Sequence, residues 1–202
     1  MNITVLFPTV TEARCLSRSD VDVAVCGVGL VQAAHATTKL ILQQRPDWLI
    51  LAGIAGVYPG SALKIGDVVL VASEREADLG FYGKTGFTHL ADLDIDMEFS
   101  VRRVLHCPWL PAQPPLPLAS SNSLNVALAP FVAHAGVDVE NMEGAAFFHA
   151  CLQEEQRFLE VRAVSNRVTL DDEAWDFQAS LHALGQGLNR VIDHLLATPG
   201  NR

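Results

Sequence analysis

The chain has few charged residues and no excess of positive charge. Only 18% of its 202 residues are Asp, Glu, Lys or Arg, whereas 50% are hydrophobic, so we expect a folded globular protein rather than a disordered one. Its 14 Lys and Arg are outnumbered by 23 Asp and Glu, which gives a net charge of −9. Because nucleic acids and anionic membranes are bound through clustered Lys and Arg, we expect neither as a partner. A small molecule or a protein remains.

Sequence patterns for metal sites, disulfides and membrane spans are also missing. The four cysteines are scattered without a Cys-x-x-Cys pair, and the seven histidines show no His-Glu-x-x-His spacing, so we expect reduced thiols and no metal. No apolar run approaches the ~20 residues that span a bilayer. Residues 1–15 lack the basic start and apolar core of a signal peptide. We therefore expect a cytoplasmic protein with one domain over residues 1–202.

The hydrophobic pattern predicts an α/β fold, because short β-branched runs alternate with a helical one, which is typical of a parallel sheet. The expected strands are Ile3–Phe7, Val21–Cys26, Trp48–Ala52, Val68–Ser73 and Phe158–Val164. The expected helices are Val31–Gln44, a possible short one over Asp96–Leu105, and an amphipathic one over about Glu173–Leu196. The expected irregular segments are a glycine-rich loop from Gly53, a long loop over Ala77–Ile95 and a proline-rich excursion over Pro108–Pro117.

Two polar groups lie at the ends of buried elements in the stretch Val137–Asp172. Glu143 opens an apolar, helix-like run, and Asn166 follows an apolar strand. Chain ends at the edge of an α/β sheet are where ligand sites form. Each residue also has a structural explanation: Glu143 could complement the helix dipole, and Asn166 could be a turn or cap residue. Met142, directly before Glu143, favours a ligand site, since an apolar side chain and a carboxylate together could hold a ring and hydroxyl groups.

Three further features lie close to predicted strand ends. Glu12 follows the first strand and is explained most simply as a carboxylate in the first turn of a helix. The Gly-Val-Gly at 27–29 lacks the third glycine of a dinucleotide fingerprint, since Gln32 stands there, so we predict no cofactor. Gly53 and Gly56 could bring backbone amides close to a ligand or form a tight turn.

Several segments together resemble the purine nucleoside phosphorylase and nucleosidase superfamily, and within it the futalosine hydrolases. The likeness extends along nearly the whole chain. It implies a phosphorylase/hydrolase-like α/β fold, a single domain with a central twisted, mixed but largely parallel sheet flanked by helices. The segments are GIAG at 53–56, LKIGDVVLV at 63–71, ADLG at 77–80, NMEGAAF at 141–147 and VRAVSN at 161–166.

The resemblance also implies site residues. Met142 would pack under a ribose while Glu143 accepts hydrogen bonds from its 2′ and 3′ hydroxyls. Glu12 matches the acidic residue that activates water, and Asn166 matches the group that hydrogen-bonds the leaving purine. Two catalytic residues, Glu12 and Asn166, are thus expected. The further substrate-binding positions expected are Ile54, Ala55, Leu124, Asn141 and Ser165.

Asn166 stands where nucleosidases acting on 6-aminopurines have an aspartate. An adenine leaving group is helped by a proton, which a carboxylic acid supplies if its pKa is raised above the usual ~4. A 6-oxopurine instead presents O6 and N7, both acceptors, to which an amide donates at every pH. Asn166 therefore indicates a 6-oxopurine such as the hypoxanthine of futalosine.

Two other positions depart from the resembled pattern. Leu124 stands where an aromatic side chain stacks on the base in related nucleosidases, and a leucine would cover a purine with less stacking. Asn141 replaces a common glutamate before the Met-Glu-Gly motif, which leaves its contact with substrate open.

The expected function is hydrolysis of the N-glycosidic bond of futalosine, releasing hypoxanthine for menaquinone biosynthesis. The alternatives are a nucleosidase for methylthioadenosine and S-adenosylhomocysteine, a phosphorylase, and a nucleoside-binding protein without catalysis. A phosphorylase needs cations around phosphate, and Arg45 is the only Arg between Gly27 and Ser61. The resemblance also implies a closed homo-oligomer.

Overall fold

The computed structural model describes residues 1–94, 101–127, 131–171 and 175–197. Eight strands of the described chain form one sheet, and two more form a separate hairpin. The strands are β1 (Ile3–Phe7), β2 (Asp22–Val25), β3 (Trp48–Val57), β4 (Val68–Glu76), β5 (Gly80–Gly83), β6 (Gly86–His89), β7 (Leu105–His106), β8 (Leu118–Ser123), β9 (Val139–Asn141) and β10 (Phe158–Arg167). The helices are α1 (Val10–Ala13), α2 (Leu30–Gln44), α3 (Gly144–Gln153) and α4 (Phe177–Ala197), with a 3-10 turn at Leu90–Asp92.

The sheet has the order β10-β4-β8-β9-β3-β1-β2, and β10 also pairs with β3, so five of its strands close on themselves. Parallel pairs join β2 to β1, β1 to β3, β3 to β10, β4 to β8 and β8 to β9. The pairs β10–β4, β3–β9 and β4–β7 are antiparallel. The expectation of a mixed, largely parallel sheet is confirmed.

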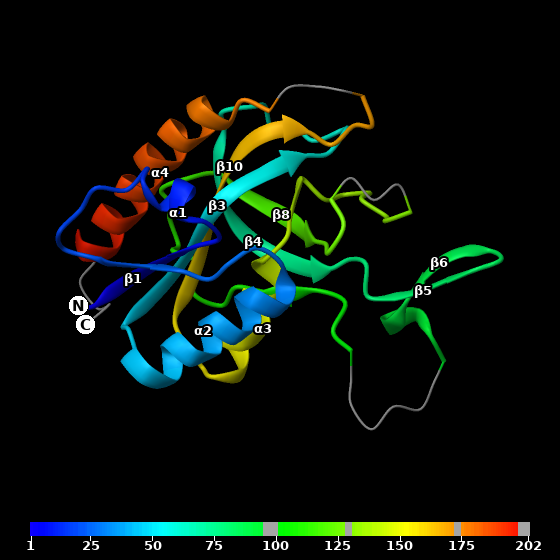
Figure 1. The fold of residues 1–202 in the computed structure, drawn as a ribbon, viewed down its shortest axis with the longest axis horizontal. Coiled ribbons are helices and arrows are strands. Elements are labelled where there is room, and N and C mark those ends of the chain that lie inside the picture. The colour runs from blue at the N-terminus through cyan, green and yellow to red at the C-terminus, as the bar shows by residue number, and fades with distance from the viewer. Residues whose placement is uncertain (95–100, 128–130, 172–174, 198–202) are drawn as a thin grey trace.

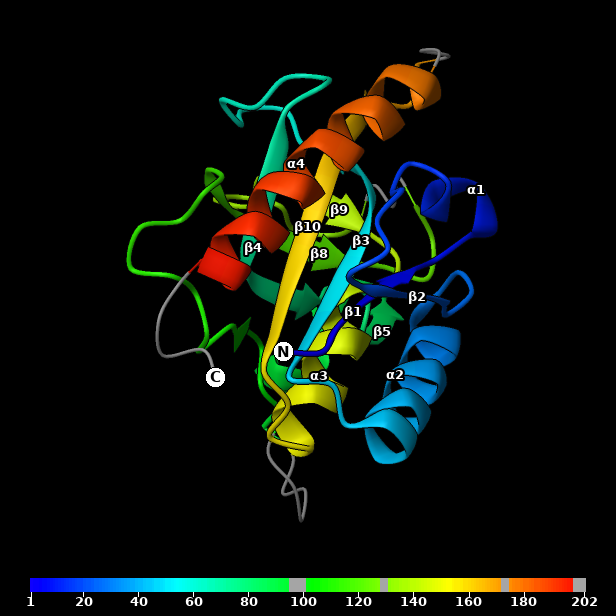
Figure 2. The same ribbon diagram turned by 90° about the vertical axis from the view of Figure 1, so that its left-hand side faces the viewer.

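Helices cover the sheet on two sides, as Figures 1 and 2 show. The long helix α4 lies across β10 and β3, while α3 packs against β4, β8 and the neighbouring α2. α4 is amphipathic, with Leu184, Leu188, Val191 and Leu195 at most 1% exposed, because this face seals the core. The expected single-domain α/β architecture flanked by helices is therefore present.

The glycine-rich loop expected from Gly53 begins later than predicted, because β3 continues to Val57, and residues 58–67 then form neither helix nor strand. A methyl group on Gly53 would lie 2.6 Å from Arg162 Nη1 and 3.1 Å from Glu12 Oε1. The glycine therefore permits two charged side chains to approach a strand, and it does not make a turn.

The long loop expected over Ala77–Ile95 was also wrong in part. Its described residues contain the hairpin β5–β6, which projects from the rest of the fold on the right of Figure 1. The short helix expected over Asp96–Leu105 falls partly outside the described residues, and residues 101–104 are not helical. The proline-rich segment Pro108–Pro117 forms neither helix nor strand, as predicted.

None of the helices in the described ranges combines the length and apolar character needed to cross a bilayer. The cytoplasmic location stays a prediction.

Candidate active site

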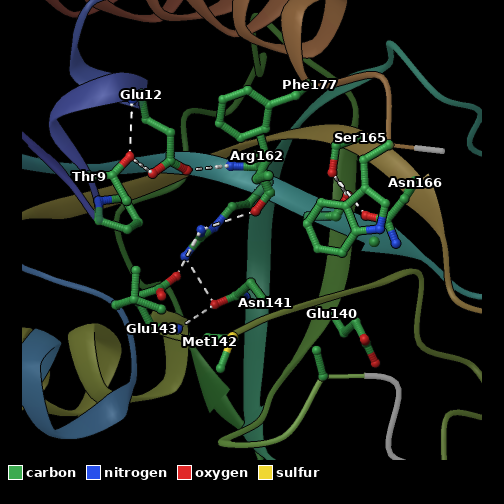
Figure 3. A pocket seen from close by; sticks show the side chains of 17 residues that line it. Thr9, Glu12, Glu140, Asn141, Met142, Glu143, Arg162, Ser165, Asn166 and Phe177 are labelled. Atoms are coloured by element: carbon green, nitrogen blue, oxygen red, sulfur yellow. Dashed lines mark hydrogen bonds and ion pairs between the residues drawn. The ribbon is translucent and has the colours of Figure 1, made fainter.

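A cavity of about 200 Å³ opens where the carboxyl ends of β1, β3 and β10 meet the N-terminus of α3. This edge is where open α/β sheets bind ligands. Eight of the nine predicted site residues line it, and they are Glu12, Ile54, Ala55, Asn141, Met142, Glu143, Ser165 and Asn166. Figure 3 shows these carboxylate and amide groups spread around one hollow.

Glu12 is held in the cavity wall by both of its carboxylate oxygens. Thr9 is the N-cap of α1, and its hydroxyl accepts from Glu12 N at 3.1 Å and donates to Glu12 Oε2 at 2.6 Å. The backbone N–H of Ile54 donates to Glu12 Oε1 at 3.2 Å. Glu12 is therefore both the first-turn carboxylate that the sequence suggested and a buried acid, 4% exposed, in the cavity.

Glu143 is the N-cap of α3 and is fixed from two directions. The backbone N–H of Gly29 donates to Glu143 Oε1 at 3.1 Å, and Arg162 Nη1 donates to Oε2 at 3.2 Å. Gly29 has φ 96°, a conformation that favours glycine, and this turn brings its amide to Glu143. The Gly-Val-Gly motif thus supplies a backbone hydrogen-bond donor to the Glu143 carboxylate. Each carboxylate oxygen keeps a lone pair for a ligand hydroxyl.

Asn141 lines the cavity, but its amide is already occupied. Its Nδ2 donates to Glu74 at 2.6 Å and to Ser121 at 2.8 Å, so both of its N–H groups are used. Its Oδ1 accepts from the backbone N–H groups of Glu143 and Gly144, at 2.8 and 2.7 Å, and from Arg162 at 3.0 Å. Asn141 therefore supports the start of α3, which explains a position that the sequence left open.

Ser165 and Asn166 both face the cavity because β10 is irregular there. The register against β3 shifts between Val164 and Asn166, a bulge that turns successive side chains to one side. The Ser165 hydroxyl lies 2.9 Å from Asn166 Oδ1, to which it can donate, and Asn166 Nδ2 donates to the carbonyl of Arg167 at 3.1 Å. One amide N–H of Asn166 remains for a ligand.

Arg162 is the main site residue that sequence reasoning missed. It lies in the middle of β10, is 1% exposed, and lines the cavity beside Glu143. Burial alone would lower its pKa, but the carboxylates of Glu160 and Glu143 raise it, so the guanidinium stays charged. A signal was present, since Glu160 and Arg162 are charged residues at alternate positions of a buried strand.

Other cavity residues were also missed. Thr9, Glu140, Trp175 and Phe177 line the cavity, and Trp175 and Phe177 are 52% and 37% exposed. Figure 3 shows Phe177 between Glu12 and Ser165, on the opposite side of the hollow from Met142. Trp175 and Phe177 stand at the start of α4, and the sequence marked this region only as a helix end.

The structure does not bring Leu124 to the cavity. Its side chain is fully buried and packs with Ala77 and Val132 in a separate hydrophobic cluster. Leu124 directly follows β8, and its backbone N–H donates to the backbone carbonyl of Asn141 at 3.0 Å. The predicted contact of Leu124 with a base therefore has no support in this placement.

Within the part of the chain that is described, no three His, Cys, Asp or Glu side chains gather in a way that could hold a metal ion.

Comparisons with known proteins show the family of the chain. The chain matches the phosphorylase superfamily over residues 11–114 and 117–197. It is 35% identical over 186 residues to a futalosine hydrolase of Thermus thermophilus, covering 82% of this chain and 78% of the relative. A 5′-methylthioadenosine/S-adenosylhomocysteine nucleosidase of Colwellia psychrerythraea is 28% identical over 167 residues, covering 75% and 68%.

Among solved structures, the futalosine hydrolase of Helicobacter pylori has a similar fold. Its TM-score is 0.73 at 16% identity, with 96% of this chain and 98% of that chain covered. The chain therefore belongs to the phosphorylase superfamily, and it is similar over most of its length to nucleosidases of that superfamily.

Proposed function

We propose that the protein hydrolyses the N-glycosidic bond of futalosine and releases hypoxanthine. The observation that carries the substrate class is the orientation of Asn166. With the Ser165 hydroxyl 2.9 Å from Asn166 Oδ1, the amide oxygen is occupied and an N–H is left for the ligand. Such a donor complements O6 or N7 of a 6-oxopurine, whereas the N6 amino group of adenine would need an acceptor.

The sugar would lie against Glu143 and Met142, which follow one another at the start of α3. Glu143 would accept hydrogen bonds from the ribose hydroxyls, and its charge would favour an oxocarbenium-like transition state. Arg162 limits that charge by pairing with Glu143 at 3.2 Å.

Glu12 would take the proton from the attacking water. Its carboxylate lines the cavity and is held by Thr9 and Ile54, so it can point toward the sugar without reorganising. General base assistance contributes roughly 10²–10⁴ in rate. Asn166 would meanwhile stabilise the charge that grows on the departing base.

Water is favoured over phosphate as the nucleophile. Among the described residues that line the cavity, Arg162 is the only Lys or Arg, and it is bound to Glu143, Glu160 and Asn141. The nearby amide of Gly29 is bound to Glu143. A phosphate would find no uncommitted cation here, which phosphorylysis requires.

The face of the base would be covered by aromatic side chains from the start of α4 rather than by Leu124. Trp175 and Phe177 line the cavity and remain partly exposed, so each ring can pack on a planar ligand. Among the described residues that line the cavity, no uncommitted cation is available to pair with the benzoate tail of futalosine. Arg75, Phe81 and Tyr82, cationic and aromatic residues that could meet such a tail, do not line this cavity.

The test is to incubate the protein with futalosine, inosine and methylthioadenosine, each with and without phosphate, and to identify the base and sugar released. We expect hypoxanthine from futalosine, a free sugar hydroxyl, and no dependence on phosphate. Adenine from methylthioadenosine at a greater rate would overturn the substrate, and a sugar phosphate would overturn hydrolysis. Binding of nucleosides without release of any base would show a binding protein.

We also propose that the chain forms a closed homo-oligomer, as the resemblance implies. Large apolar side chains are exposed on α2 and on the β5–β6 hairpin, with Val31 78%, Tyr82 72% and Phe81 52% exposed. Burial of such side chains favours association. Light scattering on the purified protein at micromolar concentration should give a mass above the 21.9 kDa of one chain, and a monomer would contradict the proposal.

A further inference from the structure

Two glutamates with no assigned task lie buried beneath the cavity. Glu74 on β4 and Glu160 on β10 are both 0% exposed. They meet under the first residue of α3, because a methyl group on Gly144 would overlap the Glu74 carboxylate and lie 2.7 Å from Glu160 Oε1. Gly144 is therefore required where two carboxyl groups face each other across the start of a helix.

The two carboxyl groups have different partners. Glu160 Oε1 accepts from Arg162 Nε at 2.7 Å, while its buried Oε2 has no donor among the residues that the structure describes. Glu74 Oε1 accepts from Asn141 at 2.6 Å, and Glu74 Oε2 accepts from the Ser123 hydroxyl at 2.8 Å. A buried carboxylate oxygen without a donor is costly, and a proton on the neighbouring carboxyl would supply one.

The local charges point the same way. Glu74, Glu160 and Glu143 surround the single guanidinium of Arg162. Burial, and then the charge of Glu160, raise the pKa of Glu74 well above its ordinary value. Burial also raises the pKa of Glu160, against the effect of Arg162. The thiols of Cys107 and Cys151 face Glu160 and stay neutral, since burial raises the pKa of each.

We propose that Glu74 and Glu160 hold one proton between them, and that this pair positions Glu143 through Arg162 and Asn141. Glu160 takes Arg162 Nε at 2.7 Å, which leaves Nη1 for Glu143 at 3.2 Å. Glu74 orients the Asn141 amide, whose oxygen caps the backbone of Glu143 and Gly144. Both glutamates are positioning residues, because neither lines the cavity.

The shared proton has a functional consequence. If no carboxylate paired with Nε, the guanidinium of Arg162 would pair with Glu143 alone and would pull the Glu143 carboxylate away from a ligand. If Glu74 and Glu160 were both ionised, their two negative charges would lie buried beside the single positive charge of Arg162, which is costly. One proton on the pair keeps Arg162 divided between Glu160 and Glu143. The role rests on the proposed contact of Glu143 with ribose.

A double-mutant cycle separates a shared proton from two independent charges. In either single Gln variant the remaining glutamate is ionised, so the pair holds no proton but keeps its one negative charge. In the double variant the pair has no charge. We expect Glu74→Gln to lower kcat/KM about threefold, Glu160→Gln about tenfold, and the double variant more than about a hundredfold, beyond the product of the single effects. Effects that multiply would overturn the shared proton.

Infrared spectroscopy tests the proton without an activity assay. The native protein at neutral pH should show the carbonyl stretch of a protonated carboxyl group, and each single Gln variant should lack it. The signal does not depend on the substrate, so it stands even if futalosine is not cleaved. The same band in both single variants, or its absence from the native protein, would contradict the proposal.

Binding measurements test the positioning role. The affinity for free base, measured with hypoxanthine and adenine, should be the same in the native protein, in Glu160→Gln and in the double variant. The affinity for the C-nucleosides formycin A and formycin B, which carry ribose and cannot be hydrolysed, should fall in the order of kcat/KM. Glu76→Gln, on the same strand as Glu74 but outside the network, is the matched control. An equal loss for base and nucleoside would show a merely structural role.

Discussion

The two ends of the cavity are built differently. At one end, Glu143 is bound to Arg162 and Gly29 and is connected through Asn141 to the buried acids below, so both of its carboxylate oxygens have a fixed partner. At the other end, Ser165 and Asn166 are neutral and sit on a strand bulge with one N–H uncommitted. Figure 3 shows Arg162 with Asn141 and Glu143 on one side and Asn166 on the other.

The difference suggests a division of tasks. A charged, fully bonded end suits a part of the ligand that is always the same, such as ribose, because its geometry cannot adjust. A neutral amide at a strand end suits discrimination, since changing one atom reverses a donor and an acceptor. Four substitutions test whether the ends are separable.

Glu12→Gln should have the largest effect, because it removes the proposed base and belongs to neither end. We expect kcat to fall about 10²–10⁴-fold for every nucleoside tested. The amide can keep the contacts to Ile54 and Thr9, so the thermal unfolding midpoint should be nearly unchanged. Steady-state kinetics check this result, and full activity would exclude Glu12 as the base.

Glu143→Gln tests the charged end and should be next in size. We expect kcat/KM to fall about 100-fold with every base alike, since the ribose contact is common to all substrates. Arg162 would also lose one ionic partner, which costs about 3 kcal/mol or more in unfolding free energy when a buried pair is broken. Denaturant melts measure that cost. A changed preference between hypoxanthine and adenine nucleosides would argue against separable ends.

Asn166→Asp tests the neutral end. It replaces the donor facing the base with an acid, so hydrolysis of the hypoxanthine nucleoside should fall about 10- to 100-fold, while that of methylthioadenosine rises relative to it. Competition assays with both substrates in one tube give the ratio directly. Equal losses for both would show that Asn166 does not select the base.

Glu74→Gln tests how much stability the buried acids below the charged end cost, and it should have the smallest effect of the four substitutions. The pKa of Glu74 is raised by burial and by Glu160, so folding takes up a proton. Native stability should therefore fall as pH rises above the ordinary glutamate pKa of about 4.3 toward the raised value. The stability of Glu74→Gln should fall less over this pH range, so the variant should be more stable than the native protein at pH 7–8. Urea melts of the native protein and the variant across this pH range measure it.

Much of the fold could be predicted because its strands and helices carry strong patterns. Ile3–Phe7, Trp48–Ala52 and Phe158–Val164 are mostly apolar runs buried on both faces, so their positions follow from hydrophobicity, even though Phe158–Val164 also contains Glu160 and Arg162. The second half of β3 was missed because glycine there signals close approach of side chains from elsewhere, which resembles a turn signal. The hairpin β5–β6 was missed because Gly80–His89 has no alternating pattern.

The site shows the same limit. Glu143 and Asn166 could be predicted from the sequence because polar residues at the ends of apolar runs are typical of ligand sites at the edge of a sheet. Glu12 and Ser165 were predicted through the resemblance to the superfamily. The sequence by itself did not determine what holds them. Arg162, Glu160 and Glu74 lie in the interior of strands. Glu160 and Arg162 are two residues apart on β10, but Glu143 lies 19 residues before Arg162, and Glu74 lies 86 residues before Glu160 on β4. Only the closure of β10 against both β3 and β4 brings these charges together, because a buried charge is tolerated only where the tertiary fold supplies its partner.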